Sequence, residues 1–214
     1  AQPPFGQRLM HRPRLLLELL RRLQPRTRVA DQLRVHREAH RLERPGPTVP
    51  VGGVDEVTRD CFVEAMGGEL EAFGFRTEPG FDGLQARGLL WGGNLAVVQS
   101  MLGTPHFPKV KGGILFLEDV NEHPYRVERA LLQLHQAGVL GQQKAVLLGA
   151  FSDWRKSPLD RGYTLKTAIA QLRSVCKVPV LTGVPFGHVP VKVTMPMGTK
   201  VQLVVQGRDV LVGW

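Results

Sequence analysis

Apolar residues along this chain follow two patterns, short continuous runs and helical repeats. Continuous runs at Ile114–Leu117, Lys144–Phe151 and Val178–Thr182 predict three buried strands. Between the strands, apolar residues recur at intervals of three and four, which predicts two helices. The inner faces of these helices hold Val127, Ala130, Leu131, Leu134 and Ala137 in the first, and Leu165, Ala168, Ile169, Leu172 and Val175 in the second. The order strand, helix, strand, helix, strand is typical of an α/β fold.

The segments on either side of this unit carry weaker patterns. A short helix is predicted over Val57–Met66. A second helix is predicted over Leu95–Leu102, for which Asn94 is a good amino-terminal cap. Residues 69–87 have glycine-rich turns and little periodicity, which indicates a loop. Further β-structure is expected near the end of the chain, at Val191–Met195, Lys200–Gln206 and Asp209–Trp214.

The first 50 residues differ in composition from the rest of the chain. They hold eleven arginines, no lysine and four acidic residues, and residues 51–214 carry only +2 of the total charge of +9. A helix is expected over Arg14–Leu23, and no period holds from Thr27 to Arg44. This favours a solvated arm, with a slipped reading frame in GC-rich DNA as the alternative. A basic groove on a fold would not be confined to one quarter of the chain, so nucleic acid is not an expected partner.

Cysteine use and hydropathy favour a reducing compartment. Cys61 and Cys176 lie far apart and form no CxxC pair, which argues against a disulfide scaffold or a structural zinc site. No apolar run approaches the ~18 residues that a membrane span requires. No secretory signal is visible at Ala1. These features predict a cytoplasmic protein without a membrane partner.

Polar residues that follow two of the predicted strands indicate chemistry at the strand ends. Glu118 and Asp119 follow the first strand, and His188 follows the third in a loop rich in Gly and Pro. Chemistry in open α/β sheets collects at the carboxyl ends of strands. Histidine is the commonest general base, and a carboxylate can orient it. Glu118 and His188 are therefore predicted to be an acid and a base that activate a nucleophile, with a solvated carboxylate and a surface histidine as the alternative.

The cluster EDVNEH also contains residue types that bind metals. Glu118, Asp119, Glu122 and His123 could serve a metal hydrolase, but neighbouring residues on a helix point to different faces and no HExxH motif is present. Gly92-Gly93 is not followed by the GK[ST] of a phosphate loop. Neither a metal nor another cofactor is expected.

Four stretches of the chain resemble the carboxyl-terminal domain of the LD-carboxypeptidases, which include muramoyltetrapeptide carboxypeptidase and have the microcin C resistance peptidases as relatives. The stretches are LLWGGNLAVVQSMLGTPHFP, GGILFLEDVNEHPYRVERALLQLHQAGVL, KAVLLGAFSD and VPVLTGVPFGHVPVKVTMPMGTKVQL. The resemblance implies a Ser-Glu-His triad, with the glutamate of the LED motif at Glu118 and the histidine of the PFGH motif at His188. Asn94 is a candidate substrate-binding residue. Glu122 competes with Glu118 for the role of triad acid, but a position at the rim or a helix end suits it better.

The nucleophile that the resemblance implies is not visible. The family carries it as a serine in a G-[FY]-S-D turn upstream of a Gly-Pro pair such as Gly46-Pro47. No serine precedes Ser100 here, and Ala30-Asp31 is the nearest similar pair. Ser152 lies in a matching Phe-Ser-Asp sequence, but it follows a strand of the carboxyl-terminal domain and is interpreted as structural. The chain is therefore expected to have little or no peptidase activity.

The resemblance also implies how the chain is divided and what the complete enzyme does. Residues 1–50 would be an Arg/Pro/Leu-rich remnant of an α/β nucleophile domain, 51–88 the end of that domain and a linker, and 89–214 the carboxyl-terminal domain, a mixed sheet with flanking helices and a β tail. The implied reaction is serine-type hydrolysis of the L,D-amide that releases terminal D-alanine from murein tetrapeptide in peptidoglycan recycling, by a possible homodimer. A microcin C resistance-type serine peptidase and a non-catalytic peptide-binding fragment are the alternatives.

Overall fold

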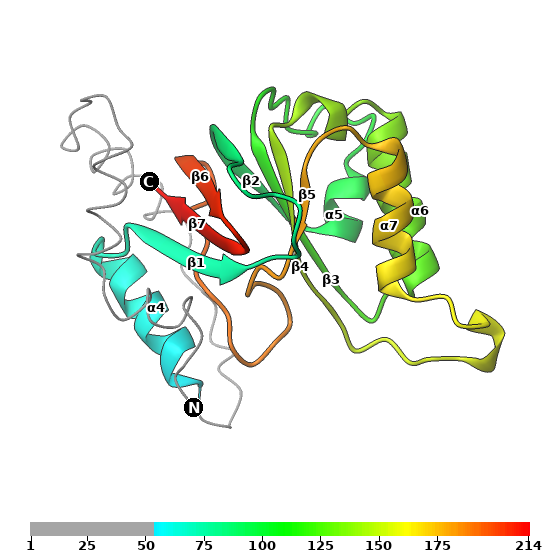
Figure 1. Ribbon diagram of the computed structural model, residues 1–214, viewed down its shortest axis with the longest axis horizontal. Coiled ribbons are helices and arrows are strands. Elements are labelled where there is room, and N and C mark those ends of the chain that lie inside the picture. Colours follow the sequence, from blue (N-terminus) through cyan, green and yellow to red (C-terminus); the bar gives the residue numbers. More distant parts are fainter. Residues whose placement is uncertain (1–53) are drawn as a thin grey trace.

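The computed structural model describes residues 54–214, which form one mixed sheet with helices on both faces (Figure 1). The sheet has seven strands in the order β1-β7-β6-β2-β3-β4-β5. The strands are β1 (Ala72–Arg76), β2 (Gln85–Asn94), β3 (Ile114–Val120), β4 (Ala145–Ser152), β5 (Val180–Thr182), β6 (Lys200–Gln206) and β7 (Asp209–Gly213). The helices are α4 (Glu56–Gly67), α5 (Leu95–Ser100), α6 (Pro124–Gln136) and α7 (Leu165–Val175), with short 3-10 turns η1 (Leu140–Gln142) and η2 (Pro158–Asp160).

Strand β2 joins a parallel half of the sheet to an antiparallel half. Its residues 90–94 pair in parallel with β3, and its residues 85–89 pair antiparallel with β6. β4 and β5 extend the parallel half, and β7 and β1 extend the antiparallel half. Gly92 makes the close pairing with β3 possible, because a Cβ at this position would lie 1.9 Å from the carbonyl oxygen of Phe116.

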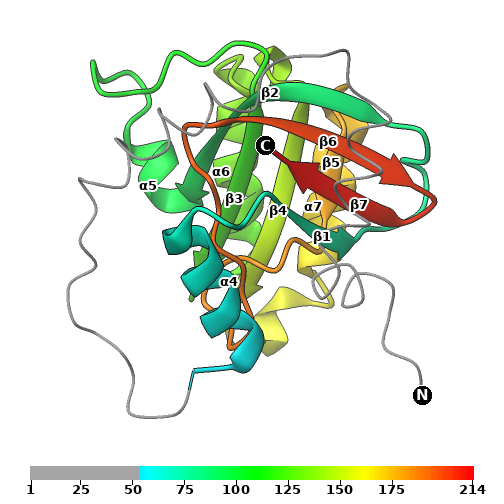
Figure 2. The same cartoon turned by 90° about the vertical axis from the view of Figure 1, so that its left-hand side faces the viewer.

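The side chains of β3 alternate between two cores, one on each face of the sheet. Leu115 and Leu117 pack with residues of α5, α6 and α7, whereas Ile114 and Phe116 pack with residues of α4, β1, β6 and β7. Figures 1 and 2 show α6 and α7 on one face and α4 on the other. Because side chains alternate along a strand, this pattern directs Glu118 to the face of Phe116.

Local signals explain where the helices start. The side chain of Asp55 accepts hydrogen bonds from the backbone N–H groups of Val57 and Thr58 and so caps α4. Thr164 caps α7 by accepting from Thr167 N. A residue with a short polar side chain satisfies amides that have no partner inside the helix.

The strands and helices predicted for the α/β unit are confirmed in type and order, with differences at their ends. Ala137, expected on the inner face of α6, is exposed because the helix ends at Gln136. β3 does not stop at Glu118 but continues to Val120. Val175, expected on the inner face of α7, is 43% exposed because the helix ends there and the chain turns away to Cys176. The expected helix over Arg14–Leu23 lies outside the described residues.

Two other predictions of local structure are wrong. The range 69–87 is not a loop, because it contains β1 and the start of β2, which gain hydrogen bonds from β7 and β6. Residues 191–195 do not form a strand, although their apolar residues alternate. Pro190 and Pro196 flank this segment and have no N–H to give to a sheet, and Val193 N bonds a loop residue, Pro185, instead of a strand.

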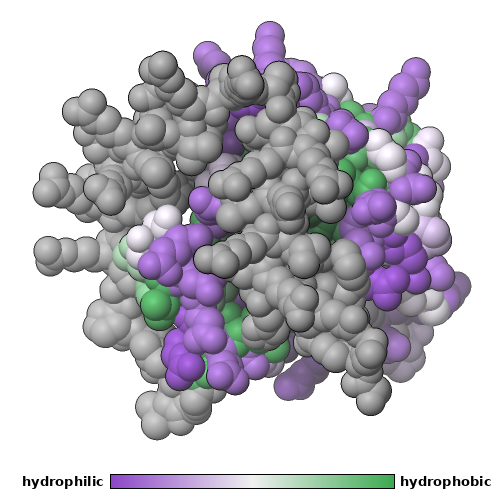
Figure 3. All heavy atoms as spheres, turned by 60° about the vertical axis from the view of Figure 1, so that its left-hand side comes forward, coloured by the Kyte–Doolittle hydropathy of each residue, from purple (hydrophilic) through white to green (hydrophobic). Residues whose placement is uncertain are grey.

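The surface of the described part is polar with scattered apolar side chains. Figure 3 shows polar residues interspersed with smaller apolar areas on the described portion of one face. Val63 of α4, for example, is 60% exposed. Between residues 54 and 214, no helix has both the length and the apolar character that crossing a membrane requires.

Candidate active site

Glu118 and His188 are in contact at the carboxyl ends of the parallel strands. His188 Nδ1 lies 3.1 Å from Glu118 Oε2. The side chain of Glu118 is only 6% exposed, whereas that of His188 is 60% exposed. A buried carboxylate thus engages one ring nitrogen of an imidazole that reaches the surface. This geometry fits a tautomer with the proton on Nδ1, which leaves Nε2 to accept a proton.

Asn94 engages the second carboxylate oxygen of Glu118. Its Nδ2 donates to Glu118 Oε1 at 3.3 Å and to Asp119 Oδ1 at 2.9 Å. Its Oδ1 accepts from Val97 N at 3.1 Å, which confirms the predicted cap of α5. Asp119 Oδ2 also accepts from Ala96 N at 3.0 Å. The ends of β2 and β3 and the start of α5 therefore form one network, and a substrate role for Asn94 stays a prediction.

His188 lies in residues 183–199, a segment without helix or strand that packs onto the end of β4. The carbonyl of Phe186 accepts from Ala150 N at 2.8 Å, and the Phe186 ring meets the Phe116 ring edge-on at 5.0 Å. Gly187 has φ 122°, and a Cβ there would lie 3.0 Å from Glu118 Oε2. Glycine at this position lets the loop lie directly against the glutamate.

Helix α4 holds the same loop beyond His188. Thr58 Oγ1 donates to the Pro190 carbonyl at 3.1 Å and accepts from Lys192 N at 3.0 Å. Cys61 Sγ accepts from Thr194 N at 3.3 Å. The Cys61 side chain is buried in the core on this face of the sheet, and this burial raises the pKa of its thiol. Sequence reasoning missed these contacts because they join residues more than 130 positions apart, without a local signal.

The side chains of Glu122 and His123, which the sequence also offered as metal ligands, lie beside other residues. Glu122 lies 3.7 Å from Arg126 of α6 in an (i, i+4) ion pair. His123 Nδ1 lies 3.8 Å from Asp160 Oδ1. Among residues 54–214, no three His, Cys, Asp or Glu side chains are grouped so that they could hold a metal ion. The described residues therefore give a metal hydrolase no support.

The four serines of the chain all fall within the described range, and none donates to the imidazole of His188. Ser100 and Ser174 donate to carbonyls of their own helices at 2.8 and 2.7 Å. Ser157 caps η2 by accepting from Leu159 N. Ser152 is close to the site, but its Oγ donates to the backbone carbonyl of His188 at 2.9 Å. The acid and the base are present in this part of the chain without a nucleophile beside them.

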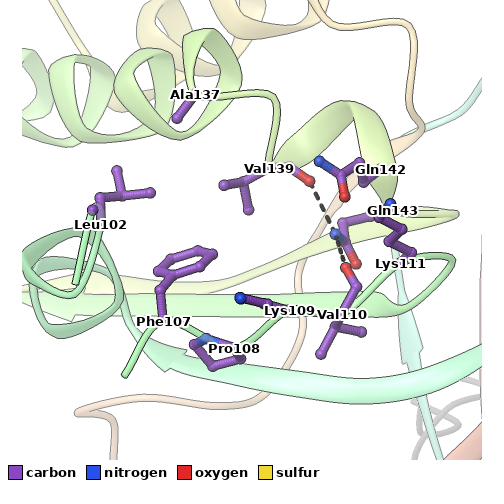
Figure 4. A pocket seen from close by; sticks show the side chains of 11 residues that line it. Leu102, Phe107, Pro108, Lys109, Val110, Lys111, Ala137, Val139, Gln142 and Gln143 are labelled. Atoms are coloured by element: carbon purple, nitrogen blue, oxygen red, sulfur yellow. Dashed lines mark hydrogen bonds between the residues drawn. The ribbon is translucent and has the colours of Figure 1, made fainter. Parts of the chain in front are cut away.

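A cavity of about 350 Å³ lies at the opposite end of β3, between residues that precede β3 and residues that precede β4. Leu102, Phe107, Ala137 and Val139 face one another across it (Figure 4). Gln143 borders it and is fixed by hydrogen bonds to the carbonyls of Val110 and Val139 and from Trp91 Nε1. Since Glu118 and His188 lie at the other end of the strands, this cavity is separate from their contact.

Comparison with known proteins places most of the described chain in one group. The profile of the family described as LD-carboxypeptidase C-terminal domain matches residues 87–203. The murein tetrapeptide carboxypeptidase of Pseudomonas aeruginosa is 36% identical over 107 residues, which are 49% of this chain and 34% of that protein. The "Probable murein peptide carboxypeptidase" of Bacillus subtilis is 32% identical over 116 residues, 54% of this chain and 36% of that protein.

Solved structures give the same grouping. The crystal structure of muramoyltetrapeptide carboxypeptidase from Oxalobacter formigenes has a TM-score of 0.69 at 41% identity and covers 75% of this chain and 55% of that chain. The microcin C7 self immunity protein MccF has a TM-score of 0.56 at 23% identity over 65% of this chain and 41% of its own, which is a similarity of fold. The chain spans between 30% and 39% of the length of the first curated relatives that it matches.

Proposed function

This chain belongs to the LD-carboxypeptidase family, and we propose that Glu118 and His188 are the acid and the base of a serine-type carboxypeptidase site. The observation that supports this most directly is the 3.1 Å contact between His188 Nδ1 and the buried Glu118 carboxylate. Orientation of an imidazole by a buried carboxylate is the arrangement by which serine hydrolases activate their nucleophile.

The roles of the two residues follow from this contact. His188 Nε2 takes the proton of the attacking serine and later gives it to the leaving amine. Glu118 keeps the imidazole in the required tautomer and stabilises the imidazolium that forms. Backbone N–H groups beside the serine would stabilise the oxyanion, and one such donor is typically worth ~3 kcal/mol.

The substrate that we propose is murein tetrapeptide, cut at the L,D-amide that precedes its terminal D-alanine. Support comes from the relatives, of which one is named for murein tetrapeptide and another for murein peptide. The enzyme that we propose would work in the cytoplasm as a homodimer, and its activity would serve peptidoglycan recycling.

In this proposal the nucleophilic serine comes from an amino-terminal domain rather than from residues 1–214. No serine precedes Ser100, and no described serine donates to the His188 ring. In this proposal residues 1–50 are a remnant of that domain, residues 51–88 lead out of it, and residues 89–214 supply the acid and the base. Without the serine the covalent step is lost, so the chain alone binds peptide without cutting it.

A chimera tests this proposal. Residues 1–53 are replaced by the amino-terminal half of the Oxalobacter formigenes enzyme, whose matched region is 41% identical to this chain. We expect the chimera to release D-alanine from murein tetrapeptide and the original chain to release none. His188→Ala in the chimera should lower kcat by about 10⁴-fold or more, since removal of one triad member leaves only residual catalysis.

Two results would contradict the proposal. One is release of D-alanine by the original chain at the rate of the complete relative, because no described serine is placed to attack. The other is a folded chimera that cuts the tetrapeptide equally well with and without His188.

A further inference from the structure

Ser152 lies at the end of β4, and its side-chain hydroxyl contacts the residue that carries the predicted base. Its Oγ donates to the His188 carbonyl at 2.9 Å across 36 positions of sequence. The sequence offered Ser152 as a false match to a nucleophile motif. We propose that Ser152 is a positioning residue that fixes the backbone of His188 and so keeps its imidazole on Glu118; this rests on the proposed function.

A bulge in β4 explains why Ser152 faces His188. The register pairs Leu117 with Leu148 and then Asp119 with Phe151, so two residues of β4 lie opposite Glu118 alone. Before the bulge, Leu148 faces the core under α5, α6 and α7; after it, Phe151 faces that same core. Strict alternation would have turned Ser152 toward these helices. The extra residue turns it to the face of Glu118, and bulges commonly redirect side chains beside active sites.

The two residues of the bulge also bring the His188 loop close. Gly149 has no side chain, and a Cβ there would lie 2.5 Å from the Phe186 carbonyl oxygen. Ala150 N donates to that carbonyl at 2.8 Å. β4 therefore holds the loop at three points: Leu148 O accepts from Val184 N at 3.4 Å, Ala150 N donates to the Phe186 carbonyl, and the Ser152 hydroxyl donates to the His188 carbonyl.

Of these three attachments, only the Ser152 hydroxyl can be removed by changing a side chain while the strand is kept, because the other two join backbone groups. His188 is 60% exposed, so packing alone does not restrain its ring. The residue after Ser152, Asp153, has φ 61° and turns the chain sharply away from the strand. The hydroxyl is thus the last contact from β4 to the loop before the chain leaves the site.

NMR of the full 214-residue chain tests this role without any turnover. The ¹⁵N-labelled chain should show the signal of the His188 Nδ1–H group that is bonded to Glu118. Ser152→Ala should speed exchange of this proton with water by about 5-fold, because losing one hydrogen bond of ordinary net strength has an effect of that size. Ser152→Thr keeps a hydroxyl and should restore slow exchange. Ser152→Cys keeps the size but has only a weak donor, so it should behave like Ser152→Ala.

Ser174→Ala is the matched control, because Ser174 Oγ also donates to a backbone carbonyl, that of Gln171 at 2.7 Å, but in α7. It should leave the His188 signal unchanged. In the active chimera, Ser152→Ala should lower kcat between about 10- and 100-fold with little change in KM, as expected for a misplaced catalytic group.

An unchanged His188 Nδ1–H signal and exchange rate in folded Ser152→Ala and Ser152→Cys would overturn the proposal. Labelling of Ser152 by a fluorophosphonate would also overturn it, because the serine would then be a nucleophile. The NMR result does not depend on hydrolysis, so an inactive chimera would count against the proposed function and leave this result standing.

Discussion

Glu118 is a buried carboxylate with each oxygen engaged by a different neighbour. Oε2 meets His188, and Oε1 meets the amide of Asn94, which also bonds Asp119. A buried charge is costly unless its oxygens are hydrogen-bonded. Asn94 therefore does more than cap α5, since its amide group also donates to the carboxylates of Glu118 and Asp119.

Asn94→Ala should destabilise the protein by more than the loss of a helix cap. We expect the free energy of unfolding to fall by about 2–3 kcal/mol, of which ~1 is the cap and the rest the charged hydrogen bonds. Urea unfolding followed by circular dichroism measures this change. Thr164→Ala is the matched control, because it removes the cap of α7 and an exposed contact with the Thr167 hydroxyl but no bond to a carboxylate, and it should cost about 1 kcal/mol. Equal losses in the two variants would show that the amide bridge contributes nothing.

At the scale of helices and strands, the sequence predicts what local periodicity determines. The apolar runs of β3 and β4 and the spacing of α6 are confirmed, because each buries a continuous set of side chains. β1, with sequence AFGFR, and the glycine-rich β2 have no such signal and owe their structure to pairing with β7 and β6.

The candidate site likewise has a part that the sequence predicts and a part that it does not. The sequence placed Glu118 and His188 at strand ends, and the structure brings them together, while their catalytic roles stay a prediction. The β4 bulge and the contact of Thr58 with the His188 loop depend on tertiary packing between distant segments, so no local pattern revealed them.

Gly187 shows how the loop depends on one missing side chain. Gly187→Ala should cost more stability than Gly198→Ala, since both residues have positive φ, at 122° and 85°, but only Gly187 has close neighbours. An alanine at Gly198 meets nothing within 4 Å, so it should cost only the backbone strain of about 1–2 kcal/mol. At Gly187 the new methyl group would press on Glu118 and Ala150 and displace the loop.

Thermal or urea unfolding of both glycine variants gives the difference in stability, and the Nδ1–H signal of His188 reports the loop. We expect Gly187→Ala to lose that signal and Gly198→Ala to keep it. If both variants keep it, the loop does not need glycine to lie on Glu118.

At the scale of the whole molecule, the site is assembled from segments that span most of the described chain. β2 supplies Asn94, β3 supplies Glu118, the end of β4 supplies Ser152, and α4 supports the loop that carries His188. Residues 54–88 thus contribute to the same sheet and the same site as the residues that follow them. We infer that the folding unit includes α4 and β1. It therefore begins before residue 89, where the carboxyl-terminal domain was expected to start.

Truncation tests this inference. A chain of residues 54–214 should unfold cooperatively, whereas a chain of residues 89–214 should not hold the native sheet. The shorter chain loses β1, which pairs along the whole of β7, and it loses Phe73 and Phe75, which are 1% and 5% exposed in the second core. Burial of two phenylalanine side chains contributes about 3–6 kcal/mol, a large share of the roughly 5–15 kcal/mol by which domains are stable.

Loss of α4 would also leave Pro190 and Lys192 without their hydrogen bonds to Thr58. Circular dichroism and urea unfolding of the two chains measure the difference, and equal midpoints would show that residues 54–88 are a linker after all.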